Sequence, residues 1–121
     1  MKLTRRLFLS ATAAGLALPA AAHHGWRWTD DGRFELTGLI TEARLGNPHG
    51  VLTIDADGEI WIAEVGQPWR NERAGLEADM MTPGTEVKII GKRAADAADR
   101  KVKAEAVIIA GTTYELYPER L

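Results

Sequence analysis

The amino-acid sequence predicts a small, mostly β domain whose five strands close into a barrel. Apolar and polar residues alternate over several short stretches, which is typical of strands with one buried face. The chain holds 12 glycines among 121 residues, and this frequency indicates many turns and few long helices. A single stretch has the three- and four-residue apolar spacing of a helix, and it falls between the third and fourth predicted strands.

Strong turn signals separate the first three predicted strands. The first strand runs from Arg33 to about residue 45, with a phase shift after Ile40, and Gly38 suggests a bulge or bend within it. After the break at residues 46–48, a second strand covers residues 50–55, and the following Asp-Ala-Asp-Gly sequence is typical of a hairpin turn. The third strand covers residues 59–65. Its inner face is predicted to carry Ile60, Ile62 and Val65, with Trp61 on the other face.

One helix and two more strands complete the predicted domain. The helix is expected from Trp69 to Met81, with an apolar stripe formed by Trp69, Arg73, Leu76 and Met80. Strands at residues 85–92 and 102–110 follow, joined by a polar loop. The order β-β-β-α-β-β is that of a small five-stranded OB-like barrel. Closing the sheet also removes the exposed edges that a small lone domain would otherwise have.

Residues 1–22 have the pattern of a cleaved bacterial signal peptide. Lys2 and the pair Arg5-Arg6 precede an apolar stretch, and small residues end it at Ala20-Ala21-Ala22. The paired arginines followed by Leu-Phe-Leu resemble the twin-arginine consensus, an address that an export receptor reads. The apolar stretch, roughly a dozen residues long, is too short to cross about 30 Å of hydrocarbon. We therefore expect a periplasmic protein cut after Ala22, or one or two residues earlier.

The mature chain would then have three parts: an N-terminal segment at residues 23–32, the barrel at 33–111 and a tail at 112–121. Without the three basic residues of the leader, 12 basic residues face 17 acidic ones, a net charge of −5. An acidic domain is a poor partner for nucleic acid and offers little attraction to anionic membranes.

The chain has no cysteine, which excludes disulfides and thiolate sites, and its single serine lies in the leader. We therefore expect no catalytic activity.

Three histidines, His23, His24 and His49, are the candidate metal ligands. If the mature chain begins at His23, the α-amino group and ring Nδ1 of this residue can chelate one ion, because both lose a proton readily near neutral pH. Such nitrogen sites bind copper most strongly among the divalent first-row metals. An earlier cut would leave Ala21-Ala22-His23, which is a known Cu(II) and Ni(II) pattern. His49 follows Asn47-Pro48 in the first interstrand turn and completes the site if the N-terminal segment reaches that turn.

Other readings of these residues stay open. A polar chain terminus can contain histidines by chance, and the barrel would then be a structural or protein-interaction module without a metal. An oxidative copper enzyme is a third hypothesis, for which no substrate-binding surface is evident. The four tryptophans are expected in the core or at its rim. The basic residues of the last two predicted strands are expected to form a solvated face: Lys88, Lys92, Arg93, Arg100, Lys101 and Lys103.

Several short motifs, taken in order, resemble a family of small exported bacterial proteins. They are His23-His24-Gly25-Trp26, Leu36-Thr37-Gly38, Asn47-Pro48-His49, Trp61 with Glu64 and Gly66, Pro68, Arg73-Ala74-Gly75-Leu76, and Pro83-Gly84-Thr85-Glu86-Val87. The family is catalogued only as a domain of unknown function, so the resemblance implies no activity. It does imply that the leading histidines belong with the Asn-Pro-His turn. Gly25 departs from the family's usual serine, and Gly50-Val51 from its frequent aromatic residue.

Overall fold

The computed structural model describes residues 24–121, and of His24 it describes the backbone alone. The predicted signal peptide and His23 lie outside the described residues. The strands are β1 (Phe34–Arg44), β2 (Val51–Ala56), β3 (Glu59–Glu64), β4 (Glu86–Arg93), β5 (Lys101–Ile109) and β6 (Thr112–Glu115). The helical elements are η1 (His24–Trp26), α2 (Pro68–Arg73), η2 (Ala78–Met80) and η3 (Pro118–Arg120).

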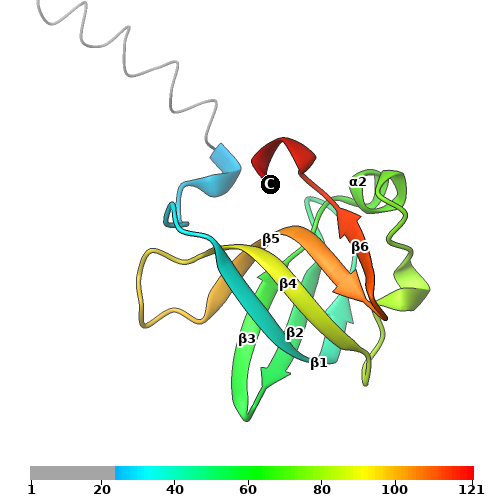
Figure 1. Cartoon of the computed structure of the whole chain (residues 1–121), viewed down its shortest axis with the longest axis horizontal. Coiled ribbons are helices and arrows are strands. Elements are labelled where there is room, and N and C mark those ends of the chain that lie inside the picture. The colour runs from blue at the N-terminus through cyan, green and yellow to red at the C-terminus, as the bar shows by residue number, and fades with distance from the viewer. Residues whose placement is uncertain (1–23) are drawn as a thin grey trace, which may run out of the picture.

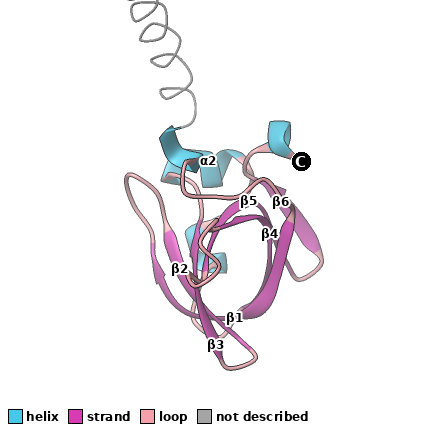
Figure 2. Ribbon diagram, turned by 90° about the vertical axis from the view of Figure 1, so that its left-hand side faces the viewer, coloured by secondary structure: helices cyan, strands magenta, loops and turns pink. Residues whose placement is uncertain are grey.

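The strands form one sheet that closes on itself. Their order is β3-β2-β1-β4-β5-β6, and every neighbouring pair in this order is antiparallel. In addition, β3 pairs in parallel with β5. This pairing closes the five strands β1, β2, β3, β4 and β5 into a barrel, which Figure 2 shows end-on. The predicted mostly β, five-stranded OB-like barrel is confirmed, and α2 follows β3 and precedes β4 as expected.

The core fills the inside of this barrel with aliphatic side chains from β1 to β5 and with the ring of Trp61. The largest fully buried residues include Ile40, Leu52, Ile54 and Ile89. Trp61 is 5% exposed and stacks on Phe34 with ring centroids 5.1 Å apart. The expected facing of the third strand is therefore wrong for Ile60 and Trp61, whereas Val65 is buried as expected. Trp61 pairs with the buried Ile54 in the register of β2 and β3, which turns its ring inward and leaves Ile60 50% exposed.

The predicted helix from Trp69 to Met81 is also wrong in its length and its stripe. α2 ends at Arg73, because Gly75 takes the left-handed conformation with φ +89°, which a continuing helix cannot accommodate. η2 is a separate short turn. Leu76 is fully buried, but Trp69 is 50% exposed and does not belong to an apolar stripe.

Two glycines allow strands to approach more closely than any side chain permits. A β-carbon on Gly38 would lie 2.5 Å from the carbonyl oxygen of Asp55, and one on Gly91 would overlap the carbonyl oxygen of Lys103. The register of β1 and β2 shifts between Ile40 and Glu42, which confirms the phase shift expected after Ile40. The bulge therefore lies beyond Gly38 and not at this glycine itself. In the β2–β3 turn, Asp57 and Gly58 both have positive φ, as the Asp-Gly signal predicts.

The C-terminal tail packs on the barrel. β6 pairs with the second half of β5, next to the position where the first half of β5 pairs with β3. The backbone NH groups of Leu116 and Tyr117 both donate to the Glu105 carbonyl, at 2.9 and 3.0 Å, and Leu116 is 1% exposed. Figure 1 shows η1, α2 and the C-terminal η3 at one end of the barrel, opposite the β2–β3 hairpin. Among the described helices, none is long and apolar enough to cross a membrane.

Candidate functional site

His49 lies in the loop between β1 and β2, and this loop is fixed against the end of β3. The NH of Gly50 donates to the Gly66 carbonyl, and the NH of Val65 donates to the Gly50 carbonyl, each at 3.0 Å. Gly50 is buried, and a β-carbon there would lie 2.8 Å from a methyl group of Val65. These contacts bring His49 next to Glu64, the last residue of β3.

Glu64 is the centre of a cluster of charged side chains on the outside of the barrel. Its Oε2 lies 3.4 Å from His49 Nε2 and 3.2 Å from Lys101 Nζ, and its Oε1 accepts a hydrogen bond from Lys103 Nζ at 3.3 Å. The Glu64 and Lys103 side chains are each 8% exposed, whereas those of Lys101 and His49 are 31% and 32% exposed. We call these four residues the Glu64 cluster.

The strand register explains why the cluster is on the outer face. Glu64 and Lys103 are direct partners in the parallel pairing of β3 with β5. Their chain neighbours Ala63 and Val102 belong to the core, and side chains alternate between the two faces of a strand. The parallel pairing that closes the barrel therefore also places the carboxylate against the ammonium group.

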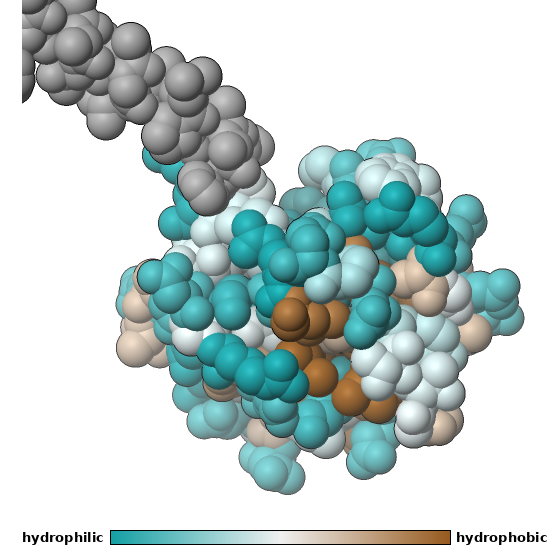
Figure 3. All heavy atoms as spheres, turned by 45° about the horizontal axis from the view of Figure 1, so that its top comes forward, coloured by the Kyte–Doolittle hydropathy of each residue, from teal (hydrophilic) through white to brown (hydrophobic). Residues whose placement is uncertain are grey.

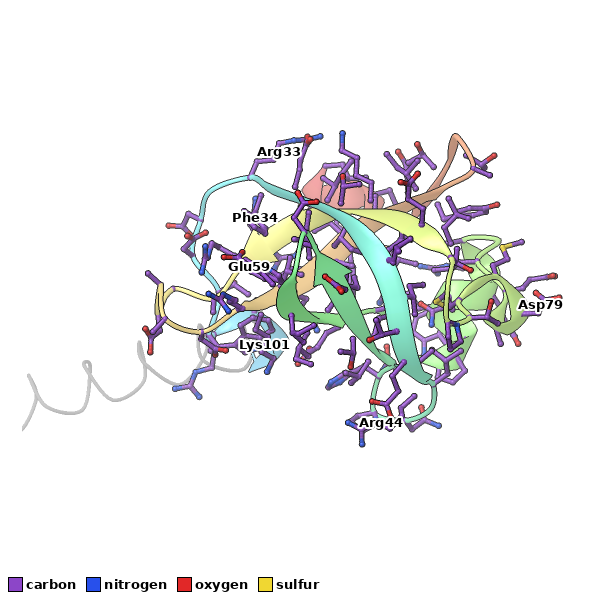
Figure 4. The ribbon with its side chains drawn as sticks, turned by 90° about the horizontal axis from the view of Figure 1, so that it is seen from below. Arg33, Phe34, Arg44, Glu59, Asp79 and Lys101 are labelled. Atoms are coloured by element: carbon purple, nitrogen blue, oxygen red, sulfur yellow. The ribbon has the colours of Figure 1, made fainter. Side chains whose placement is uncertain are left out.

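Two tryptophans of the N-terminal segment cover the lysines of this cluster. Lys103 Nζ lies 5.1 Å from the ring centre of Trp26, and Lys101 Nζ lies 4.3 Å from that of Trp28. The segment is tied to β4 and its loop, since Asp30 NH donates to the Arg93 carbonyl and Ala95 NH donates to the Trp28 carbonyl, both at 2.9 Å. Figure 4 shows Lys101 beside the light-blue N-terminal segment. Each ammonium group thus lies near a carboxylate and near the electron-rich face of an indole.

The C-terminal tail covers the same tryptophan from another side. Tyr117 meets Trp26 edge to face at 5.1 Å, and the Arg120 guanidinium lies 3.7 Å from its ring centre. Arg70 of α2 stacks over Tyr117 at 4.0 Å and donates to the Leu116 carbonyl at 3.0 Å. Both ends of the described chain therefore meet next to the Glu64 cluster.

Burial raises the pKa of Tyr117 above the ordinary value of 10.0, and the charges of Glu119 and Glu64 act in the same direction against the opposing guanidinium of Arg70. Because the pKa is raised, the folded state favours the protonated phenol over the phenolate. The stability that Tyr117 contributes in this way is fully present below pH 10, the ordinary pKa, and is lost as the pH rises through the folded-state pKa. We expect Tyr117→Phe to reduce the loss of stability above pH 10. Urea unfolding midpoints of both proteins between pH 8 and 11 provide the measurement, and parallel pH curves would contradict the expectation.

The structure places the predicted ligands as follows. His49 belongs to the Glu64 cluster, His24 begins η1 with its side chain outside the described atoms, and His23 lies outside the described residues. A β-carbon on Gly25 would lie 3.8 Å from Lys103 Nζ. Lys103 Nζ, which lies 5.1 Å from the ring centre of Trp26, is 3.3 Å from Glu64 Oε1, and Glu64 Oε2 is 3.4 Å from His49 Nε2, so this series of side chains connects the N-terminal segment to the interstrand turn.

The sequence pattern missed Glu64, Lys101 and Lys103 as members of this site. The expectation of a fully solvated basic face is wrong for Lys103, because the N-terminal segment and Glu64 cover it. One feature of the sequence could have indicated that Lys103 is buried: in the strand β5 it lies between two apolar residues, Val102 and Ala104. Among the side chains that the structure describes, no three His, Cys, Asp or Glu residues are grouped to hold a metal ion.

Most of the surface facing the viewer in Figure 3 is hydrophilic, with one limited apolar area in the middle of that face. The large apolar residues that are most exposed come from several separate elements. They are Leu39, Leu45, Ile60, Trp69 and Leu121. Apolar residues exposed singly are ordinary on soluble proteins and do not by themselves mark an interface.

Comparison with known proteins identifies a family and a fold. The profile of DUF6152, a family of unknown function, matches residues 12–103. No curated protein matches the sequence.

Among solved structures, the crystal structure of the S. pombe Stn1–Ten1 complex is similar with a TM-score of 0.52 and 18% identity, over 66% of this chain and 59% of the other chain. The crystal structure of TiaS in complex with tRNA and ATP gives a TM-score of 0.49 and 17% identity, over 65% and 18% of the two chains. The chain therefore spans less than two thirds of either structure, and these likenesses concern the fold alone.

Proposed function

Since the chain belongs to DUF6152, a family of unknown function, its own residues must supply the argument, and we propose that it is a periplasmic, non-catalytic protein that binds copper. The ligands are His23, with its α-amino group and ring, His49 from the interstrand turn, and His24 as an additional ring. Residues 1–22 act as a twin-arginine signal peptide, and cleavage after Ala22 creates the amino group. The family contributes no activity to this proposal.

One observation carries the proposal: the series of neighbouring side chains from Trp26 through Lys103 and Glu64 to His49. A site built from the chain start and the turn requires both on the same side of the barrel. Gly25 is two residues after His23, and two residues of extended chain span about 7 Å. The proposal requires these two residues to bring the N-terminal nitrogens to the His49 ring.

The charges near His49 favour a metal that prefers nitrogen ligands. Glu64 is the carboxylate beside His49, and two ammonium groups already neutralise its charge. Hard cations such as Mg²⁺ and Ca²⁺ need several oxygen ligands with negative charge. Copper is bound strongly by imidazole and amine nitrogens, which are neutral ligands and tolerate nearby lysines better.

The test is a Cu(II) titration of the mature protein, beginning at His23, in competition with a chromophoric chelator. We expect one bound copper, and we expect His49→Ala to weaken binding by roughly 100-fold or more, since loss of a direct ligand should exceed the 10- to 100-fold effect typical of second-shell changes. A form with one additional residue before His23 removes the terminal chelate and is expected to weaken binding as well.

Gly46→Ala is the matched control, because it changes the same loop at a position where a β-carbon meets nothing within 4 Å. It should bind copper like the unchanged protein. Mass spectrometry of the exported protein checks that the mature chain begins at His23. Equal copper affinity of His49→Ala and the unchanged protein would reject the three-histidine site. A complete lack of copper binding would favour the alternative, a periplasmic structural or protein-interaction module.

A further inference from the structure

We propose that Glu64 is the positioning residue for His49: its carboxylate holds the ring with the proton on Nε2 and so leaves Nδ1 as the metal-binding nitrogen. This inference rests on the proposed function, and it assigns to Glu64 a role that acts through His49. Glu64 touches the ring and is not itself a ligand.

Of the two ring nitrogens of His49, Nε2 lies near the Glu64 carboxylate. His49 Nε2 lies 3.4 Å from Glu64 Oε2, and the Glu64 side chain is 8% exposed whereas that of His49 is 32% exposed. A neutral imidazole carries its proton on one nitrogen and a lone pair on the other. A carboxylate oxygen only accepts hydrogen bonds, so the nitrogen facing it is favoured to carry the proton. The remaining nitrogen, Nδ1, then offers its lone pair to a metal.

Both carboxylate oxygens of Glu64 already have lysine partners. Lys103 donates to Oε1 at 3.3 Å, and Lys101 Nζ lies 3.2 Å from Oε2. For Glu64 to bind a metal directly, both ammonium groups would have to move away, and Trp26 and Trp28 lie over them. The lysines therefore keep the carboxylate in place as a hydrogen-bond acceptor.

The pairing of His49 with Glu64 matches a general feature of metal sites. A histidine ligand usually donates its second ring NH to a carboxylate or carbonyl, and this partner fixes the tautomer and the orientation of the ring. Glu64 supplies such a partner on a strand end, and the two Gly50 hydrogen bonds fix the loop that carries His49. In this proposal, Glu64 orients the His49 ring before any metal arrives.

The experiment has a metal-free arm and a copper arm. In the metal-free arm, nitrogen–proton correlation spectra of the ¹⁵N-labelled mature protein identify which ring nitrogen of His49 carries the proton. We expect Nε2–H in the unchanged protein and a mixture of tautomers in Glu64→Gln, because the amide can both donate and accept. Glu59→Gln is the matched control on the same strand, since the Glu59 side chain is 55% exposed and its partner is Arg100. It should leave the tautomer unchanged.

In the copper arm, we expect Glu64→Gln to weaken Cu(II) binding roughly 10- to 100-fold and Glu59→Gln to leave it unchanged. A proton on Nδ1 of His49 in the unchanged, metal-free protein would overturn the inference, and this measurement needs no variant to fold. Unchanged tautomer and copper affinity in a folded Glu64→Gln would also overturn it. A tautomer fixed by Glu64 in a protein that binds no copper would support the positioning role and reject the proposed function alone.

Discussion

Replacing Gly91 by alanine is expected to lower the free energy of unfolding by about 3 kcal/mol or more, toward the upper end of what overpacking of an interior costs. The new β-carbon would overlap the carbonyl oxygen of Lys103 on β5. A backbone atom in a closed barrel cannot move aside as the end of a flexible side chain can. β4 and β5 would have to separate at the point where their register shifts, next to the Glu64 cluster.

Urea denaturation followed by tryptophan fluorescence measures this loss. Gly46→Ala is again the control, because it introduces the same methyl group where nothing lies within 4 Å. It is expected to change the unfolding free energy by less than about 0.5 kcal/mol. Similar midpoints for the two variants would show that β4 and β5 are not as closely packed at Gly91 as we describe.

Leu116→Ala is expected to cost about 2 to 5 kcal/mol, the range for removing a fully buried leucine side chain. Leu116 lies after β6 and is 1% exposed, in contact with the barrel core. Its loss should loosen the tail that carries Tyr117 and Arg120, both of which contact Trp26. Thermal and urea unfolding of the variant provide the measurement.

The same substitution at the end of the chain is a close control. Leu121 is 47% exposed, so Leu121→Ala is expected to change stability by less than about 0.5 kcal/mol. Hydrogen exchange of the β5 and β6 backbone amides separates a local loosening of the tail from a global loss. Equal effects of the two leucine variants would mean that the tail adds little to the stability of the barrel.

The order of the elements could be predicted because turns and polar residues separate most strands clearly. β3 was different, since apolar Ile60, Trp61 and Ile62 follow one another and no alternation defines the inner face. The hairpin register decided it, by placing Trp61 beside Ile54. The predicted helix is too long because the three- and four-residue apolar spacing continues past Gly75 to Leu76 and Met80, whereas the left-handed backbone at this glycine ends α2.

The candidate site was predictable only where it is local. The Asn-Pro-His turn marked His49 as a residue held between two strands, and the structure places it there. Glu64 and Lys103 are 39 residues apart, and only the parallel pairing of β3 with β5 brings them together. In addition, lysines at every second position are typical of a solvated strand face, whereas the N-terminal segment and Glu64 cover Lys103.

Both ends of the described part of the chain meet at Trp26, and this has a practical consequence for labelling the protein. A tag or fluorescent domain fused at the C-terminus would emerge beside Arg120, close to the indole that covers Lys103. The β2–β3 hairpin lies at the far end of the barrel in Figure 2, and its exposed Asp57-Gly58 tip is a better place for an insertion. A reporter placed there would leave the histidine-bearing end of the molecule unobstructed.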